Sequence, residues 1–129
     1  MALIQDMVFD CGHPAPLARF WAAALDDYAV APYDDEERER LRGLGIDDPE
    51  DDPTVLLLPN APGRARIWFQ AVPEPKSVKN RMHLDLRSDD AEAEVLRLTG
   101  LGARVLYRFE QLVCLADPEG NEFCVLRAQ

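Results

Sequence analysis

The chain has 129 residues, 47% of them hydrophobic, which suits one ordinary core, so we expect a single domain of residues 1–129. Its net charge of −10 argues against nucleic acid as a partner, because phosphate binding needs clustered Lys and Arg. The longest apolar runs, residues 20–25 and 55–58, are too short to cross a membrane, and no secretion signal opens the chain, so we expect a cytoplasmic protein without membrane contact.

The first elements in chain order are a strand and a helix. Residues 2–11 alternate with the period of a strand, which places Asp6, Val8 and Asp10 on one face and Met7, Phe9 and Cys11 on the other. Pro14 suits the first turn of a helix that runs to about Leu25, because its missing N–H would have no partner there. His13 then lies near the N-cap, where a surface capping role is the simplest interpretation.

An acidic segment and three strands follow. Residues 34–52 hold ten acidic residues against three arginines, and the capping-box spacing of Asp34 and Glu37 predicts a short helix that ends at Gly43. The charge of this segment predicts that it lies on the solvated surface, and the alternative is an acidic docking site for a basic partner. Strands are predicted at residues 28–31, 54–58 and 66–72, and Trp68 and Gln70 share one face of the last of them.

The second part of the chain repeats this order. Residues 73–80 contain two prolines and no periodicity, which predicts a connector. Residues 81–87 alternate as a strand, and Ser88 is a suitable N-cap for a helix over residues 89–99 that Gly100 and Gly102 end. The last three predicted strands are residues 103–108, 112–116 and 122–127.

Internal duplication is the economical explanation of this repeated order. Asp6 lies seven residues before His13, and His83 lies seven residues before Asp90, so the offset is 77 at both positions. We therefore predict a first module of residues 1–72, a connector of residues 73–80 and a second module of residues 81–129.

The strand at residues 81–87 carries the candidate chemistry. Its polar face presents Arg81, His83, Asp85 and Arg87, which can be an ordinary solvated sheet face or the wall of a polar cavity. A carboxylate two residues from an imidazole can hold it in one tautomer, which is the minimal arrangement for a general base. The two arginines can grip a carboxylate or phosphate, although Arg81 and Asp85 can equally neutralise one another.

Three cysteines, Cys11, Cys114 and Cys124, lie unclustered in strand-like sequence. Their odd number and spacing indicate neither a disulfide framework nor a zinc knuckle, so reduced thiols are expected. Nothing in the sequence marks a lowered thiol pKa, which argues against Cys124 as a nucleophile.

Three motifs give the chain a family resemblance. They are FDCGHPAPLARFW at residues 9–21, VPEPKSVKNRMHLDL at residues 72–86 and DPEGNEFCVL at residues 117–126. With the doubled strand–helix–three-strand unit, the chain resembles the vicinal-oxygen-chelate superfamily, which includes glyoxalase, bleomycin-resistance proteins and extradiol dioxygenases. The resemblance implies an α+β fold of two tandem βαβββ modules that form a curved, half-open barrel-like sheet with the helices on its convex side.

The resemblance also implies positions for a metal and a ligand. Metal-binding members place histidines and glutamates on the first and last strands of the units, and these positions fall here on Asp6, His83 and Cys124. Only His83 is of the usual type, so we expect no metal cofactor, with a divalent ion as the alternative and Glu122 as a substitute ligand. Without a metal, the resemblance implies a binding cavity whose expected lining is Asp6, Trp68, Gln70, Arg81, His83, Asp85, Glu122 and Cys124.

Two functions remain open at this point. The first is metal-independent binding or sequestration of a small molecule, as in bleomycin-resistance proteins. The second is a lyase or isomerase of the glyoxalase type in which His83 is the general base and Asp85 assists it, with or without a metal. Family members commonly dimerise, so we also expect a homodimer, to which Phe109 and Leu112 can contribute.

Overall fold

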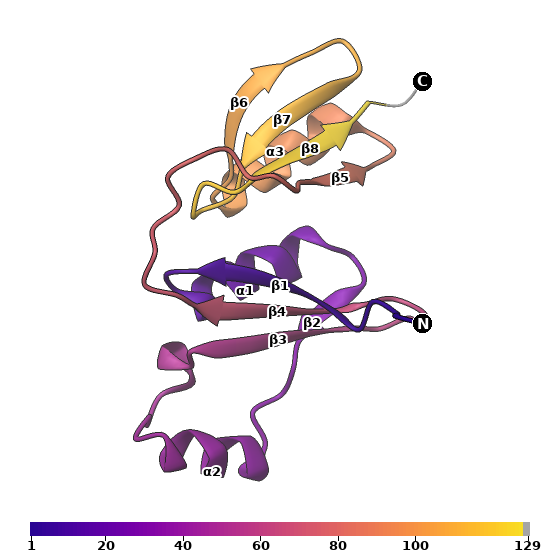
Figure 1. Ribbon diagram of the computed structural model, residues 1–129. Helices are drawn as coiled ribbons and strands as arrows, with labels where there is room; N and C mark the ends of the chain where they lie inside the picture. Colours follow the sequence, from indigo (N-terminus) through magenta and orange to yellow (C-terminus); the bar gives the residue numbers. More distant parts are fainter. Residues whose placement is uncertain (128–129) are drawn as a thin grey trace. The chain divides into compact units, whose positions relative to one another are not determined.

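The computed structural model describes residues 1–127 and has an α+β fold. Within these residues, three α-helices accompany two four-stranded mixed sheets (Figure 1), which confirms the predicted fold class. The chain divides into two compact units, Met1–Pro75 and Lys76–Gln129. None of the helices in the described part of the chain combines the length and the apolar character needed to span a bilayer.

The first unit holds one sheet and its covering helix. In chain order its elements are β1 (Asp6–Cys11), α1 (Pro14–Ala24), β2 (Tyr28–Val30), α2 (Asp35–Gly43), the 3₁₀ helix η1 (Pro49–Asp51), β3 (Thr54–Pro59) and β4 (Arg66–Ala71). The strand order is β1-β4-β3-β2, in which β1 and β4 are parallel and the other pairs are antiparallel.

The second unit repeats this topology with shorter connections. Its elements are β5 (Leu84–Arg87), α3 (Ala91–Leu101), β6 (Arg104–Arg108), β7 (Leu112–Ala116) and β8 (Glu122–Leu126). The strand order β5-β8-β7-β6, with β5 and β8 parallel, matches that of the first unit strand by strand. His13 and Asp90 are the N-cap residues of α1 and α3, as the offset of 77 predicts.

Each sheet buries one face against the helix of its own unit. In the first unit Phe9 stacks on Phe69 with ring centroids 5.2 Å apart and lies 5.7 Å from Trp21 of α1. The alternation of a strand therefore turns Asp6, Val8, Trp68 and Gln70 to the opposite side, which we call the distal face of the first sheet.

The second sheet is arranged in the same way. Phe123 and Val125 of β8 are almost completely buried, as are Val95 and Leu98 of α3, which packs against β8 and β6. The residues that alternate with them, Asp85 on β5 and Cys124 on β8, lie on the other side, which we call the distal face of the second sheet.

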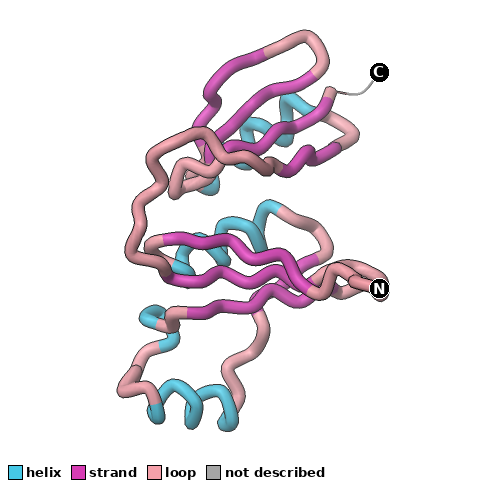
Figure 2. The backbone as a smooth tube through the Cα atoms, viewed as in Figure 1, coloured by secondary structure: helices cyan, strands magenta, loops and turns pink. Residues whose placement is uncertain are grey.

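The strand predicted at residues 81–87 is shorter in the structure, which has only Leu84–Arg87 as β5. Leu84 pairs with Phe123, so residues 81–83 would need partners at residues 120–122. The chain there is leaving the turn at residues 117–121, where Gly120 has a φ of +91°. Residues 81–83 therefore extend the loop that joins β4 to β5 (Figure 2).

The helix of the second unit starts two residues later than predicted. Ser88 is not its N-cap: the Ser88 hydroxyl bonds back to the backbone of Asp90, and the Asp90 carboxylate accepts the Ala93 N–H at 3.1 Å. Gly100 does not stop the helix either but lies within it. The C-cap of the helix is Gly102, whose φ of +121° is a backbone conformation that residue types other than glycine rarely adopt.

The acidic segment is partly tied into the first unit. Asp34 accepts the Glu37 N–H at 2.9 Å, which confirms the predicted cap. Asp52 is only 1% exposed, and its carboxylate accepts the Tyr33 hydroxyl at 2.7 Å and the Thr54 N–H at 3.0 Å. The solvated surface is therefore confined to α2 and the loop after it, and Asp52 anchors the end of that loop.

Candidate functional site

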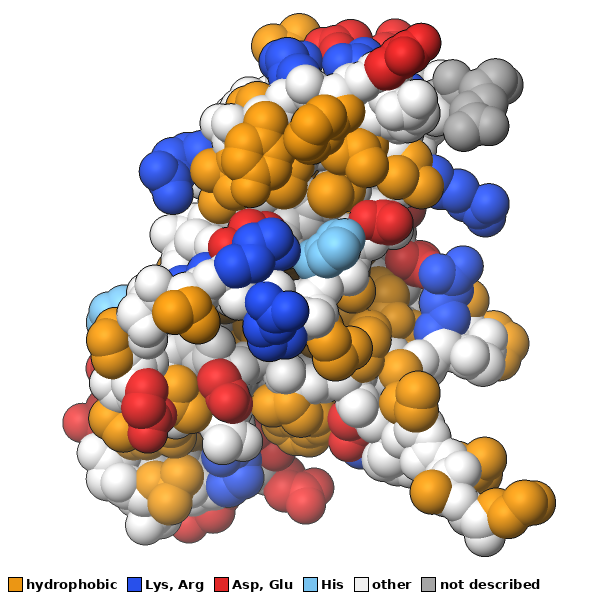
Figure 3. All heavy atoms as spheres, turned by 45° about the horizontal axis from the view of Figure 1, so that its top comes forward, with side chains coloured by type: hydrophobic (Ala, Val, Ile, Leu, Met, Phe, Trp, Pro, Cys, Tyr) orange, Lys and Arg blue, Asp and Glu red, His pale blue; other side chains and the backbone are white. Residues whose placement is uncertain are grey.

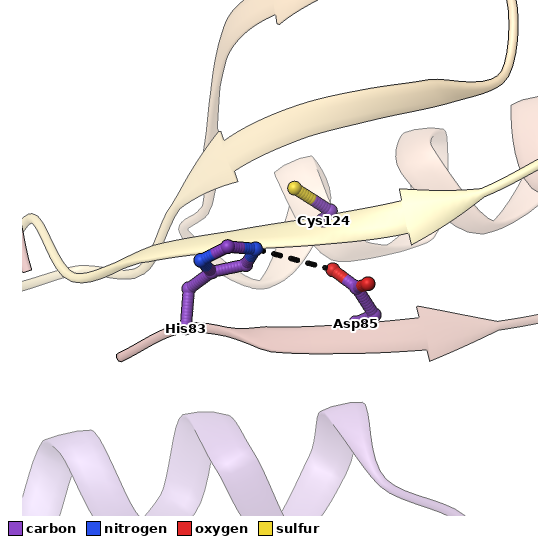
Figure 4. A group of neighbouring side chains, drawn as sticks. All are labelled: His83, Asp85 and Cys124. Carbon is purple, nitrogen blue, oxygen red and sulfur yellow. Dashed lines mark ion pairs between the residues drawn. The ribbon is translucent and has the colours of Figure 1, made fainter. Parts of the chain in front are cut away.

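The central feature of the second unit is a histidine beside a carboxylate. His83 lies one residue before β5, and Asp85 lies in it, so both side chains stand on the distal face of the second sheet (Figure 4). His83 Nε2 is 3.4 Å from Asp85 Oδ1, and the two side chains are 45% and 51% exposed. The pair is therefore close enough to act together and open enough to meet a ligand.

Cys124 completes a small group around this pair. It stands on β8 directly opposite Asp85, and the ligand atoms of His83, Asp85 and Cys124 all lie within 4.8 Å of one another. Burial raises the pKa of the Cys124 thiol to about 11, and Cys114 and Asp85 nearby add to this. The thiol is therefore protonated at neutral pH, and its reactive thiolate form becomes populated only in alkaline solution.

Glu122 has structural partners of its own. Its carboxylate accepts Lys76 Nζ at 2.9 Å and the Asn80 N–H at 3.0 Å. Although burial alone would raise the pKa of Glu122, these hydrogen bonds lower it to about 2. Glu122 thus fastens the connector to β8, and a bound ligand or ion would have to displace both partners to reach it.

Arg81 is exposed in the loop before β5. The alternative in which Arg81 neutralises Asp85 is not the arrangement in the structure, where Asp85 lies beside His83. Arg87 is likewise exposed, at the end of β5. Two guanidiniums thus flank the His83–Asp85 pair along the chain, in the order that the sequence indicates.

In the first unit, the carboxylate of Asp6 is bound by Arg66, a partner that the sequence did not predict. Asp6 on β1 and Arg66 on β4 are opposite each other, with Nε to Oδ1 at 2.8 Å and Nη2 to Oδ2 at 3.1 Å. The hydrogen bonds from Arg66 hold the pKa of Asp6 below its usual value. The parallel pairing of distant strands creates this contact, and no spacing in the sequence marks it.

Trp68 and Gln70 follow along the same face. The Arg66 guanidinium lies 5.8 Å from the centre of the Trp68 ring, in cation–π contact. Trp68 is half-buried and Gln70 is exposed, so neither belongs to the core beneath α1. The predicted site residues thus form two groups: Asp6, Trp68 and Gln70 in the first unit, and Arg81, His83, Asp85, Glu122 and Cys124 in the second. Their convergence in one cavity stays a prediction.

The donor atoms do not suit a hard divalent ion. Of the three implied ligands, Asp6 is held by Arg66, and Cys124 offers a soft sulfur atom. The neighbouring set of His83, Asp85 and Cys124 is compact but combines one nitrogen, one carboxylate and one sulfur. Glyoxalase-type ions prefer nitrogen and carboxylate oxygen, so this group fits such an ion poorly.

Comparison with known proteins identifies the family. A family model for the glyoxalase-like domain matches residues 6–126 of the chain. None of the curated proteins matches significantly.

Similar solved structures share the fold at low sequence identity. The fosfomycin resistance protein FosX from Mesorhizobium loti has a TM-score of 0.64 and 14% identity over 100% of this chain and 94% of its own. Glyoxalase I from Leishmania major has a TM-score of 0.62 and 14% identity over 98% of this chain and 87% of its own. A bleomycin-binding protein, solved with bleomycin, has a TM-score of 0.54 and 13% identity over 99% of this chain and 100% of its own.

Proposed function

The chain belongs to the glyoxalase-like domain family, and from that membership we propose that it binds a small organic molecule without a metal ion, using His83 and Asp85 as polar anchors. The observation that carries the proposal is the half-exposed His83–Asp85 pair on the distal face of the second sheet. An imidazole and a carboxylate that stand together offer a donor and acceptors to one ligand.

The state of the other polar groups supports binding without a metal. Arg66 neutralises Asp6, and Lys76 and Asn80 occupy Glu122, so these carboxylates are already satisfied inside the protein. The similar proteins include one that binds bleomycin and one named for fosfomycin resistance. A polar ligand with an anionic group suits this chain, because Arg81 and Arg87 flank the pair and can grip such a group.

The chain has only two histidines, His13 and His83, which makes the test direct. NMR spectra of the ring protons are recorded while bleomycin or fosfomycin is added as a probe. We expect the His83 signals to shift and those of His13, at the N-cap of α1, to stay in place. His83→Ala should weaken probe binding at least tenfold, whereas the matched control His13→Asn, which keeps a good N-cap residue, should not.

The result that overturns the proposal is equally clear. If neither probe nor a broader fragment set shifts the His83 signals, the pair is an ordinary solvated sheet face. Metal dependence is tested in parallel by adding Zn²⁺, Ni²⁺ or Mn²⁺ to protein purified without chelator. Ligand binding that requires one of these ions contradicts the metal-independent part of the proposal.

A second candidate function, a lyase or isomerase, is favoured by the same contact between His83 Nε2 and Asp85 Oδ1 at 3.4 Å. In this reaction the His83 imidazole accepts a proton from a carbon next to a carbonyl, and the electron pair moves onto the carbonyl oxygen as an enolate. Asp85 holds the ring in place and stabilises the resulting imidazolium. Where the first carbon bears a hydroxyl, as in dihydroxyacetone, this enolate is an enediolate. Returning the carbon-bound proton to the former carbonyl carbon, while the hydroxyl proton moves to the former carbonyl oxygen, gives the isomer.

Exchange of hydrogen with D₂O separates the two functions. Dihydroxyacetone, which carries exchangeable hydrogens next to its carbonyl, is incubated with the protein in D₂O and followed by NMR. The enzyme hypothesis predicts deuterium incorporation above the uncatalysed rate that disappears in His83→Gln and falls in Asp85→Asn. Ligand binding with exchange at the background rate favours the binding protein.

Homodimer formation is proposed on the basis of an apolar surface on the second unit. Tyr107 and Phe109, at the end of β6, are 49% and 56% exposed, and their ring centroids lie 5.8 Å apart. Hydrophobic side chains also gather in the upper part of Figure 3. Light scattering at micromolar concentration tests the proposal, because a monomer at that concentration would refute it.

A cytoplasmic location of the protein stays a prediction.

A further inference from the structure

Two cysteines face each other across neighbouring strands of the second unit. Cys114 on β7 and Cys124 on β8 are paired directly in the antiparallel register, and both thiols are free. Cys114 lies close enough to the Cys124 thiol to help raise its pKa. Both residues belong to the same sheet, so their separation is set by β7 and β8 alone.

The hydrogen bonds at the two ends of the β7–β8 pair show whether Cys114 and Cys124 form a hydrogen-bonded or a non-hydrogen-bonded pair. The Arg127 N–H donates to Gln111 O at 2.8 Å, and the Asp117 N–H donates to Asn121 O at 2.9 Å. Hydrogen-bonded and non-hydrogen-bonded pairs alternate along an antiparallel ladder. Counting inward from either end, Cys114 and Cys124 fall on a non-hydrogen-bonded pair.

This kind of pair brings side chains closest together. Its Cα atoms are typically about 4.5 Å apart, against about 5.5 Å for a hydrogen-bonded pair. Disulfides span Cα separations of about 4.4–6.8 Å, so a bond between the two sulfurs needs little backbone movement. A Cα separation of about 4.5 Å, typical of this kind of pair, is at the lower end of that range, which favours a bond that is easily reduced again.

We propose that Cys114 and Cys124 form a reversible dithiol–disulfide pair. Its oxidant is a low-molecular-weight disulfide such as oxidised glutathione. In the first step one cysteine thiolate attacks a sulfur of oxidised glutathione, forms a mixed disulfide and releases one glutathione thiolate. The second cysteine thiolate then attacks the protein sulfur of the mixed disulfide and releases the other. The two cysteine protons end on the two glutathiones, so the protein is oxidised by two electrons and oxidised glutathione is reduced.

The location of the pair gives the modification a consequence. Cys124 also belongs to the compact group with His83 and Asp85, so moving its sulfur towards Cys114 alters what lies beside the imidazole. Cys114 and Cys124 are 5% and 7% exposed, so oxidised glutathione reaches a sulfur only when this part of the sheet opens locally, and the reaction is slow. This inference goes beyond ligand binding and holds whether or not His83 binds a ligand.

The test uses the full chain without any added ligand. Reduced protein is incubated with oxidised glutathione in mildly alkaline buffer, unfolded in alkylating reagent, digested and analysed by mass spectrometry. We expect a peptide pair joined through Cys114 and Cys124, with Cys11 alkylated. Cys11 is the internal control, because it lies on β1 in the first unit and is also buried, at 4% exposure. Dithiothreitol should restore three alkylated cysteines.

Variants and a spectroscopic readout make the outcome decisive. Cys114→Ser and Cys124→Ser should each abolish the linked peptide, while Cys11→Ser should leave it unchanged, and circular dichroism checks that each variant folds. In the wild-type protein, oxidation should shift the His83 ring signals and leave those of His13 in place. The inference is overturned if all three cysteines of folded wild-type protein stay alkylatable, or if Cys11 joins either of the others at comparable yield.

Discussion

Asp6 and Arg66 stand opposite each other on the parallel strands β1 and β4 and are joined by two hydrogen bonds of 2.8 and 3.1 Å. Asp6 is the residue that the family resemblance places at a metal position, but here its charge is balanced within the sheet. The same arginine lies against Trp68, so one guanidinium organises the distal face of the first sheet.

This pair predicts a titration behaviour for Asp6. Because the Arg66 hydrogen bonds lower the pKa of Asp6 in the folded state, the stabilisation is complete above the unfolded value of 3.8 and is lost as pH falls through the folded value. NMR titration of the Asp6 carboxyl should give a pKa below 3.8 that returns towards it in Arg66→Gln. Arg104→Gln, on β6 of the second unit, is the control and should leave the titration unchanged.

Glu122 should contribute more to stability than exposed acidic residues do. Glu122→Gln removes a carboxylate that accepts from Lys76 and from the Asn80 N–H, so we expect a loss of about 2 kcal/mol in the free energy of unfolding. Denaturant unfolding at neutral pH measures it. Glu110→Gln, at an exposed position between β6 and β7, is the matched control and should change stability by less than about 0.5 kcal/mol.

The same residue gives the loss a pH dependence. The folded pKa of Glu122 is about 2, and the unfolded value is 4.5. Its contribution is therefore present above pH 4.5 and declines as pH falls towards 2. The stability difference between wild type and Glu122→Gln should shrink over that interval, and a difference that is independent of pH would contradict the ionic explanation.

Asp52 is expected to fasten the acidic segment to the first sheet. Asp52→Ala leaves the Tyr33 hydroxyl and the Thr54 N–H without their acceptor and removes the partner of Arg40, so we expect a loss of about 3 kcal/mol. Thermal and denaturant unfolding measure it. Asp51→Ala, one residue earlier and exposed, should have little effect; equal losses would show that the charge of the segment matters rather than these contacts.

Gly100 within α3 and Gly102 at its C-cap should change stability in opposite directions when each is replaced by alanine. Gly102 has a φ of +121°, where alanine is strained, and its Cβ would meet Pro118 at 3.4 Å, so Gly102→Ala should destabilise by about 1 kcal/mol or more. Gly100 lies inside α3 with open space around its Cβ, so Gly100→Ala should stabilise by about 0.5–1 kcal/mol. Equilibrium unfolding of both variants checks the signs, and a stabilising Gly102→Ala would contradict the helix end described above.

The two tryptophans should differ in fluorescence. Trp21 is 1% exposed beneath the first sheet, whereas Trp68 is half-buried on its distal face. Acrylamide should quench the wild-type emission in part, and Trp68→Phe should leave a blue-shifted emission that resists quenching. Strong quenching that persists in Trp68→Phe would place Trp21, not Trp68, at the surface.

Sequence alone determined the repeated architecture. The strand and helix periods, Pro14 at a helix start and the offset of 77 between Asp6 and His83 all reflect local rules, because alternation and capping depend on neighbouring residues. The same local information predicted His83 and Asp85 on one face, and the structure places the imidazole 3.4 Å from the carboxylate.

Only the tertiary structure decided what each polar group is bonded to. Arg66 reaches Asp6 across 60 residues, and Lys76 reaches Glu122 across 46, through strand pairings and a connector path that no local pattern encodes. The register of β7 with β8 likewise placed Cys114 opposite Cys124. These contacts depend on which strands pair and in which register. Burial of the apolar faces of each sheet determines that pairing, so the contacts exist only once the chain has folded.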